Sequence, residues 1–221
     1  MHSDREHLAR LGAVAAGGGV LILLIGTAFH PMQADPNNAV AAFTEYTADR
    51  LWVASHLMQF VGVAGLGAAL VALAGVMDVG RASAWARIGA FGAASGVVAG
   101  TALQAVDGVA LKVMVDRWAA ASGDAKALAF EGAFAVRQIE IGLAGLFSVL
   151  FALTVVAFSV AIFFSRRFAN WIGTVGLIGG AGTFAGGIAQ AYTGFSSLSM
   201  NISMSASVLL LLWAIAVGVV M

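Results

Sequence analysis

Six long apolar stretches dominate this sequence and limit what it can fold into. They cover residues of about 11–30, 51–77, 86–110, 135–164, 168–192 and 202–221. Each stretch is long enough for a helix to cross a bilayer core about 30 Å thick, which takes roughly 20 residues. We therefore predict an all-α fold, a polytopic membrane bundle of six transmembrane helices that forms a single membrane domain over residues 1–221.

The scarcity of charge supports this class and excludes others. Hydrophobic residues make up 61% of the chain and charged residues only 10%, whereas soluble domains carry about 25% charged residues. A water-soluble surface cannot be built from so few charges, and the net charge is zero. A soluble enzyme, a basic nucleic-acid binder and a disordered regulator are therefore excluded. The chain has no cysteine, which excludes disulfides, thiolate nucleophiles and cysteine-ligated metals.

The distribution of charge predicts the orientation. With the N-terminus inside, the inner segments contain Asp4, Glu6 and Asp78 as their acids and six arginines, namely Arg5, Arg10, Arg81, Arg87, Arg166 and Arg167. The outer segments hold the other five basic residues, but they are much longer, so basic residues are denser on the inner side. We expect a cytoplasmic N-terminus, and six spans return the C-terminus to the same side.

Glycines four residues apart occur on two of the predicted spans. Small residues at this spacing share one helix face and let two backbones approach closely. Two interpretations stay open: packing inside one bundle, or contact with another copy or a larger membrane complex. The spacing occurs at Gly92, Gly96 and Gly100, at Gly176 and Gly180, and at Gly182 and Gly186.

Two outer connections are predicted to contain short surface helices. Between spans one and two, Asp35 is the expected cap and Pro36 the first helical residue. An apolar face of Val40, Phe43 and Tyr46 or Thr47 then predicts an amphipathic helix on the outer surface.

Between spans three and four, the third helix is expected to run past Lys112 towards Trp118. Ser122 and Gly123 break it, and Asp124 is the expected cap of the next helix. Tyr46 and the tryptophans other than Trp85, namely Trp52, Trp118, Trp171 and Trp213, are expected to anchor the chain at the membrane interface.

Polar residues cluster at the outer ends of five spans. Three pairs are three residues apart on one helix: His56 with Gln59, Gln104 with Asp107, and Arg137 with Glu140. Such pairs share a helix face, and burial against lipid would be costly for their charges. The pattern predicts a polar chamber in the outer half of the bundle, lined by His30, His56, Gln59, Gln104, Asp107, Lys112, Arg137, Glu140 and Gln190. Alternatively, Arg137 pairs with Asp107 or Glu140 and the network serves packing alone.

Four segments resemble a family of small bacterial integral membrane proteins whose function is uncharacterised. They are His30-Pro31, Trp52-x3-His56-x2-Gln59-Phe60, Gln104-x2-Asp107-Gly108-x2-Leu111-Lys112 and Arg137-x2-Glu140-x-Gly142. The resemblance covers residues 28–165 and implies the bacterial inner membrane. It carries no activity and no functional residue over to this chain.

The residues leave several functions open. Two imidazoles near one face suit a b-type haem, with Arg137 on a propionate. His30, His56, Asp107 and Glu140 would instead suit zinc, iron or manganese, and a haem or a redox-active metal would make this a redox or electron-transfer protein. The alternatives are a proton-coupled transporter of a small solute, and an accessory subunit or a lipid- or quinone-binding protein without catalysis. The lipid bilayer is the expected partner; nucleic acid is not.

Overall fold

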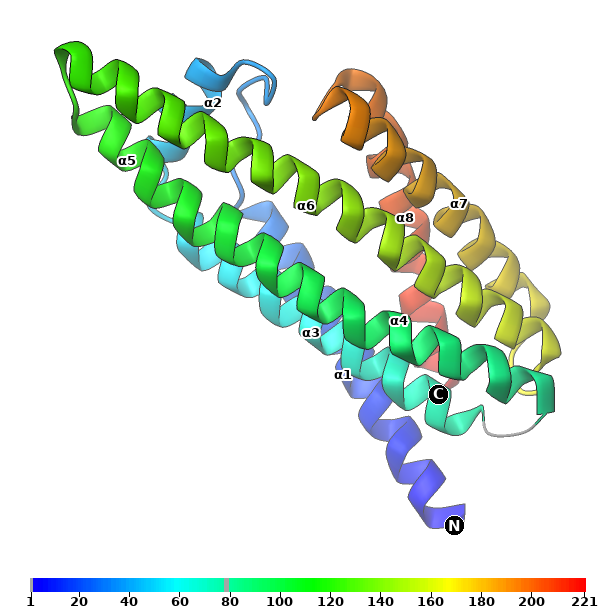
Figure 1. Cartoon of the computed structure of the whole chain (residues 1–221). Helices are drawn as coiled ribbons and strands as arrows, with labels where there is room; N and C mark the ends of the chain where they lie inside the picture. The colour runs from blue at the N-terminus through cyan, green and yellow to red at the C-terminus, as the bar shows by residue number, and fades with distance from the viewer. Residues whose placement is uncertain (1, 78–79) are drawn as a thin grey trace.

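A computed structural model describes residues 2–77 and 80–221 and shows the predicted helical bundle (Figure 1). Asp78, which entered the orientation argument, lies outside these ranges. The elements are α1 (His2–Ala28), α2 (Ala39–Ala48), α3 (Trp52–Val76), α4 (Gly80–Gln104), the π-helical segment η1 (Ala105–Leu111), α5 (Lys112–Ala120), α6 (Gly123–Phe164), α7 (Asn170–Thr193) and α8 (Ser197–Val220). Within the described ranges, six helical stretches are long and apolar enough to cross a membrane, so the predicted fold class is confirmed.

The helices extend beyond the apolar stretches from which they were predicted. The first begins at His2 instead of residue 11, and α6 begins at Gly123, twelve residues before the predicted fourth span. Hydropathy marks only the part of a helix that suits lipid, whereas backbone hydrogen bonds continue into polar sequence. As a result, α4, η1 and α5 form one continuous helical rod, and α6 returns beside it.

The two short-helix predictions need correction in detail. The helix between spans one and two exists, but Asn38 caps it by accepting a hydrogen bond from the Ala41 amide. Asp35 instead accepts from the Asn37 amide, which makes a turn before the helix. Likewise Asp124 does not cap α6: Ser122 holds that position without a side-chain bond, and Gly123 takes a positive φ of 55°. Asp124 lies in the first turn, where its charge suits the helix dipole.

Helix α2 lies against the α5–α6 hairpin (Figure 1). Phe43 is fully buried there, with its ring 5.9 Å from Trp118 and 5.7 Å from Phe130. Tyr46, Trp52, Trp118 and Trp213 are also buried, so the prediction that they anchor the interface is wrong; Trp171 is exposed. The cluster of Phe43, Trp118 and Phe130 holds α2 over one end of the bundle, here called the α2 end.

Glycines bring the helices of this chain together. A side chain on Gly92 would overlap Thr154 of α6, and one on Gly182 would lie 3.0 Å from Ala206 of α8. These contacts support the interpretation of packing inside one bundle. Gly96 is an exception, because a Cβ there would have no atom within 4 Å. At the end opposite α2 the helices enclose an apolar core that includes Leu73, Phe158 and Trp213.

Candidate metal centre

The centre of the polar region is a contact between His56 of α3 and Asp107 of η1. Nε2 of His56 lies 3.1 Å from Oδ2 of Asp107. His56 is almost completely buried, and the other carboxylate oxygen of Asp107 is buried without a hydrogen-bond partner. An ionised carboxylate with one unpartnered oxygen is costly inside a membrane.

The other ring nitrogen of His56 determines which nitrogen carries the proton in this contact. Nδ1 lies 2.7 Å from the carbonyl oxygen of Trp52, one turn earlier. A carbonyl only accepts, so the proton of a neutral His56 is on Nδ1 and Nε2 carries a lone pair. Nε2 and the Asp107 carboxylate would then be two acceptors facing each other. Such a contact is favourable only if a proton or a cation lies between them.

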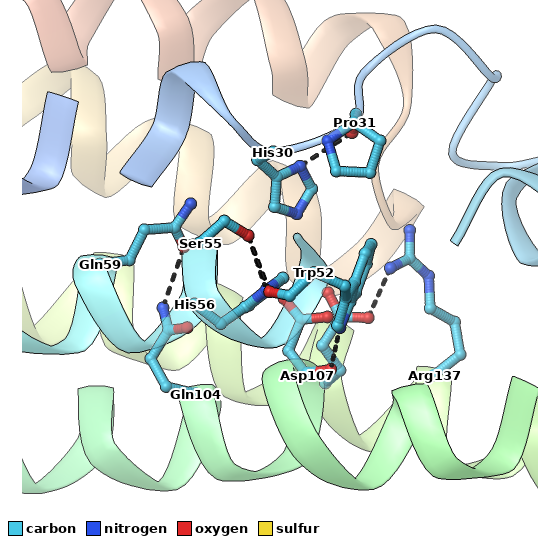
Figure 2. Close-up of polar contacts among 10 residues, drawn as sticks. His30, Pro31, Trp52, Ser55, His56, Gln59, Gln104, Asp107 and Arg137 are labelled. Atoms are coloured by element: carbon cyan, nitrogen blue, oxygen red, sulfur yellow. Dashed lines mark hydrogen bonds and ion pairs between the residues drawn. The ribbon is translucent and has the colours of Figure 1, made fainter. Parts of the chain in front are cut away.

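His30 repeats the same arrangement. It follows the end of α1, and its Nδ1 lies 2.8 Å from the carbonyl oxygen of Pro31. Figure 2 shows its other nitrogen turned towards the space beside His56, and the two ring centroids are 4.9 Å apart. Burial, and then the proximity of His56, lower the pKa of His30, which favours the neutral, lone-pair form. Potential ligand atoms of His30, His56 and Asp107 all lie within 4.8 Å of one another.

The Trp52 ring packs against both histidines of this group. The Trp52 ring lies 4.5 Å from His56, 5.1 Å from His30 and 4.2 Å from Tyr46. Its indole Nε1 donates to the backbone oxygen of Asp107 (Figure 2). Trp52 thus packs against both imidazoles and also fixes the backbone of the residue that supplies the carboxylate.

The backbone of η1 explains why Asp107 reaches His56. A short π-helical turn changes the direction of side chains within a helix and often marks a functional site. Gly108 follows Asp107, and a side chain there would overlap the His56 Cβ. The absence of a side chain at Gly108 therefore lets η1 approach α3 closely at this point.

Arg137 and Glu140 form a second buried pair, beside the first. Arg137 Nη1 donates to Glu140 Oε2 at 2.6 Å, and both side chains are buried. The guanidinium also lies 4.8 Å from the Phe195 ring and 3.4 Å from the Pro36 carbonyl oxygen. The prediction that Arg137 pairs with an acid is confirmed. Glu140 is not one of the three clustered ligands, because its carboxylate binds Arg137.

The remaining predicted residues fall into two sets. Gln59 and Gln104 pair at 3.3 Å, one turn from His56 and Asp107 on the same two helical rods. Lys112 instead binds the carbonyl oxygens of Tyr46 and Thr47 and so holds the end of α2. Gln190 lies 3.4 Å from the Ile141 carbonyl oxygen, between α7 and α6. The predicted chamber is thus a compact group with two neighbouring pairs, and Lys112 and Gln190 serve helix packing.

Sequence reasoning missed the structural roles of Trp52 and Gly108. Trp52 precedes His56 by four residues, a spacing that places both on one helix face. That spacing is a sequence signal for the packing of Trp52 on His56. The π-helical turn at Gly108 has no comparable sequence signature.

No protein-family model, curated protein or solved structure matches this chain. The resemblance to a bacterial membrane family therefore stays a prediction.

Proposed function

We propose that this protein is an integral membrane metal-binding protein in which His30, His56 and Asp107 hold one divalent transition-metal ion. The observation that carries the proposal is the contact between His56 Nε2 and the Asp107 carboxylate. With the proton held on Nδ1 by the Trp52 carbonyl, a cation between the two acceptors would satisfy both. It would also neutralise a carboxylate that has a buried, unpartnered oxygen.

The surroundings of the ligands suit a metal. Metal-bound histidines commonly donate their second ring N–H to a backbone carbonyl or carboxylate, which fixes the tautomer and the ring orientation. His30 and His56 both do so here, to Pro31 and Trp52. Two imidazole nitrogens and one carboxylate suit zinc, iron or manganese. Three protein ligands also leave a coordination position for a water or a substrate.

A haem fits this geometry less well. Axial imidazoles bind opposite faces of the macrocycle, but the His30 and His56 rings are only 4.9 Å apart and share contact with Trp52. A macrocycle between them would require both rings to move apart. Arg137, the expected partner of a propionate, is engaged by Glu140.

The membrane setting gives the proposed ion a location. With the cytoplasmic N-terminus that the charge distribution predicts, and the bacterial inner membrane that the resemblance implies, the site would lie in the outer half of that membrane. Metal exchange would then occur with the extracytoplasmic side, and the helices below would separate the ion from the cytoplasm.

Metal analysis of the purified protein tests the proposal. We expect one zinc, iron or manganese ion per chain by elemental analysis, and no haem absorption band. Asp107→Asn is the most informative variant, because the asparagine amide can donate to Nε2 and keep the fold without a cation. It should weaken metal binding at least about 100-fold, since even residues supporting a metal ligand contribute about 10–100-fold.

The matched control is His7→Ala, since His7 is exposed at the other end of α1. It should leave metal content and affinity unchanged. A haem band, the absence of any metal binding in titrations with Zn²⁺, Fe²⁺ and Mn²⁺, or an unchanged affinity in Asp107→Asn would contradict the proposal.

A further inference from the structure

A cavity of about 390 Å³ lies next to the proposed metal site. Its lining comes from α1, α3, α4, α6, α7 and α8, so it lies between the α1–α3 pair and the helices of the C-terminal half. Gln59 and Gln104 belong to the lining, one helical turn from His56 and Asp107. The volume is in the range of small-molecule sites, about 300–1,000 Å³.

The cavity is apolar except for a few uncharged groups. Its described lining residues include no charged side chain. Two of the lining residues carry a buried side-chain oxygen without a hydrogen-bond partner, the amide oxygen of Gln104 and the hydroxyl of Thr183. Buried polar atoms normally have partners, so each such exception in a cavity indicates a missing one.

The Gln59–Gln104 pair defines the chemistry of that partner. Gln104 Nε2 donates to Gln59 Oε1 (Figure 2), which leaves the Gln104 oxygen as an acceptor and the Gln59 amide nitrogen as a donor. If both amides were turned over, one acceptor and one donor would still remain. A hydroxyl group both donates and accepts, so it matches either arrangement. A carboxylate or an ammonium would be buried without a countercharge.

We propose that this cavity binds one membrane-soluble molecule with an apolar chain and an uncharged hydroxyl head, with the hydroxyl on Gln59 and Gln104. Lipid tails are as apolar as the cavity wall, so moving the chain from lipid into the cavity gains little. The hydroxyl bonds therefore decide the selectivity. This inference does not depend on the metal proposal, although the hydroxyl would lie one turn from the ion.

Photolabelling with a dodecanol analogue that carries a diazirine at the far end of its chain tests this. In the full protein in lipid nanodiscs, we expect adducts on cavity residues of α8 such as Leu210 and Val217. Dodecanol should compete with them at least about ten times better than dodecanoate. Lipid-facing residues of the same helix should be labelled without competition and serve as the internal reference.

Three variants make the test specific. Ala214→Trp fills the cavity and should abolish the competed adducts, whereas Ile215→Trp, on the exposed face of the same turn, should keep them. Gln104→Leu should remove the preference for dodecanol over dodecanoate while the metal content stays that of the unmodified protein, which separates this inference from the metal proposal. Equal competition by dodecanoate, or competed adducts that persist in Ala214→Trp, would overturn it.

Discussion

The α2 end and the glycine-lined contacts of the bundle hold helices together in different ways. At the α2 end, helices meet through packed aromatic rings and through hydrogen bonds of the charged side chains Lys112 and Arg137. At the glycine-lined contacts the helices meet backbone against backbone: a Cβ on Gly62 would lie 2.8 Å from the amide nitrogen of Leu23. The first region buries charges at an energetic cost and offers groups that can bind a ligand, whereas the second has only close apolar contacts. The comparison indicates that close apolar packing supports a polar site that would not stabilise the fold by itself.

The largest effect is expected when one member of the buried Arg137–Glu140 pair is removed and the other charge stays without a partner. Arg137→Leu should destabilise the protein by about 3–5 kcal/mol, because Glu140 then stays buried without its partner. The double variant Arg137→Leu with Glu140→Leu should recover most of that loss. Unfolding in mixed micelles, followed by circular dichroism, measures both.

Arg117→Leu is the control for this pair, since Arg117 lies on an exposed face of α5, and its effect should stay within about 0.5 kcal/mol. Equal destabilisation by the single and double variants would mean that the pair stabilises the fold through its own bonds, and that the contrast between the two regions is wrong.

The glycine contacts should be sensitive to volume where backbones touch. Gly62→Leu places a side chain against Leu23 and 2.9 Å from the carbonyl oxygen of Gly19, so α1 and α3 must separate. Overpacking of this kind costs about 1–3 kcal/mol, occasionally more. The thermal midpoint of the purified variant measures it.

The control is Gly96→Ala, because the added Cβ meets no atom within 4 Å and alanine favours the helix. Its midpoint should be unchanged or raised. The expectation from spacing alone, that every glycine of the Gly92–Gly96–Gly100 series is a close contact, is wrong at Gly96. If Gly62→Leu had the midpoint of the unmodified protein, backbone contact would not be what holds α1 to α3.

The sequence allowed the fold class and part of the site to be predicted. Apolar length predicted the spans, and the three-residue spacings predicted that His56 with Gln59, and Gln104 with Asp107, would face a common space. Spacing along one helix does not choose between partners on other helices, so it left open whether Arg137 would bind Asp107 or Glu140. The tertiary arrangement decides this, because η1 turns Asp107 towards His56.

The buried aromatic residues were harder to predict than the charged ones. Tyr46 and Trp52 have the amphipathic character that suits a membrane interface, and only the four-residue spacing of Trp52 from His56 indicates that one of them turns inward. Their burial depends on α2 lying against the α5–α6 hairpin, which is a contact between segments more than 60 residues apart in the chain. Hydropathy reports the preference of a residue and not which neighbour covers it.

The smallest expected effect concerns Tyr46, the aromatic residue that joins α2 to the site. Burial, more than any neighbouring charge, raises its pKa to about 12; Arg137 opposes this shift, and Glu140, Asp107 and Glu45 add to it. The folded state therefore keeps the phenol proton between pH 10 and 12, where the unfolded chain loses it, so stability should fall as the pH rises through this window. Tyr46→Phe should make that fall shallower in unfolding measurements from pH 8 to 12, whereas Tyr192→Phe, at an exposed position, should leave it unchanged. Because lysines and other groups also titrate at high pH, the difference between the two variants is the quantity to measure. Identical slopes for the two variants would mean that the Tyr46 hydroxyl contacts solvent, and that the aromatic cluster around Phe43 and Trp118 does not bury it.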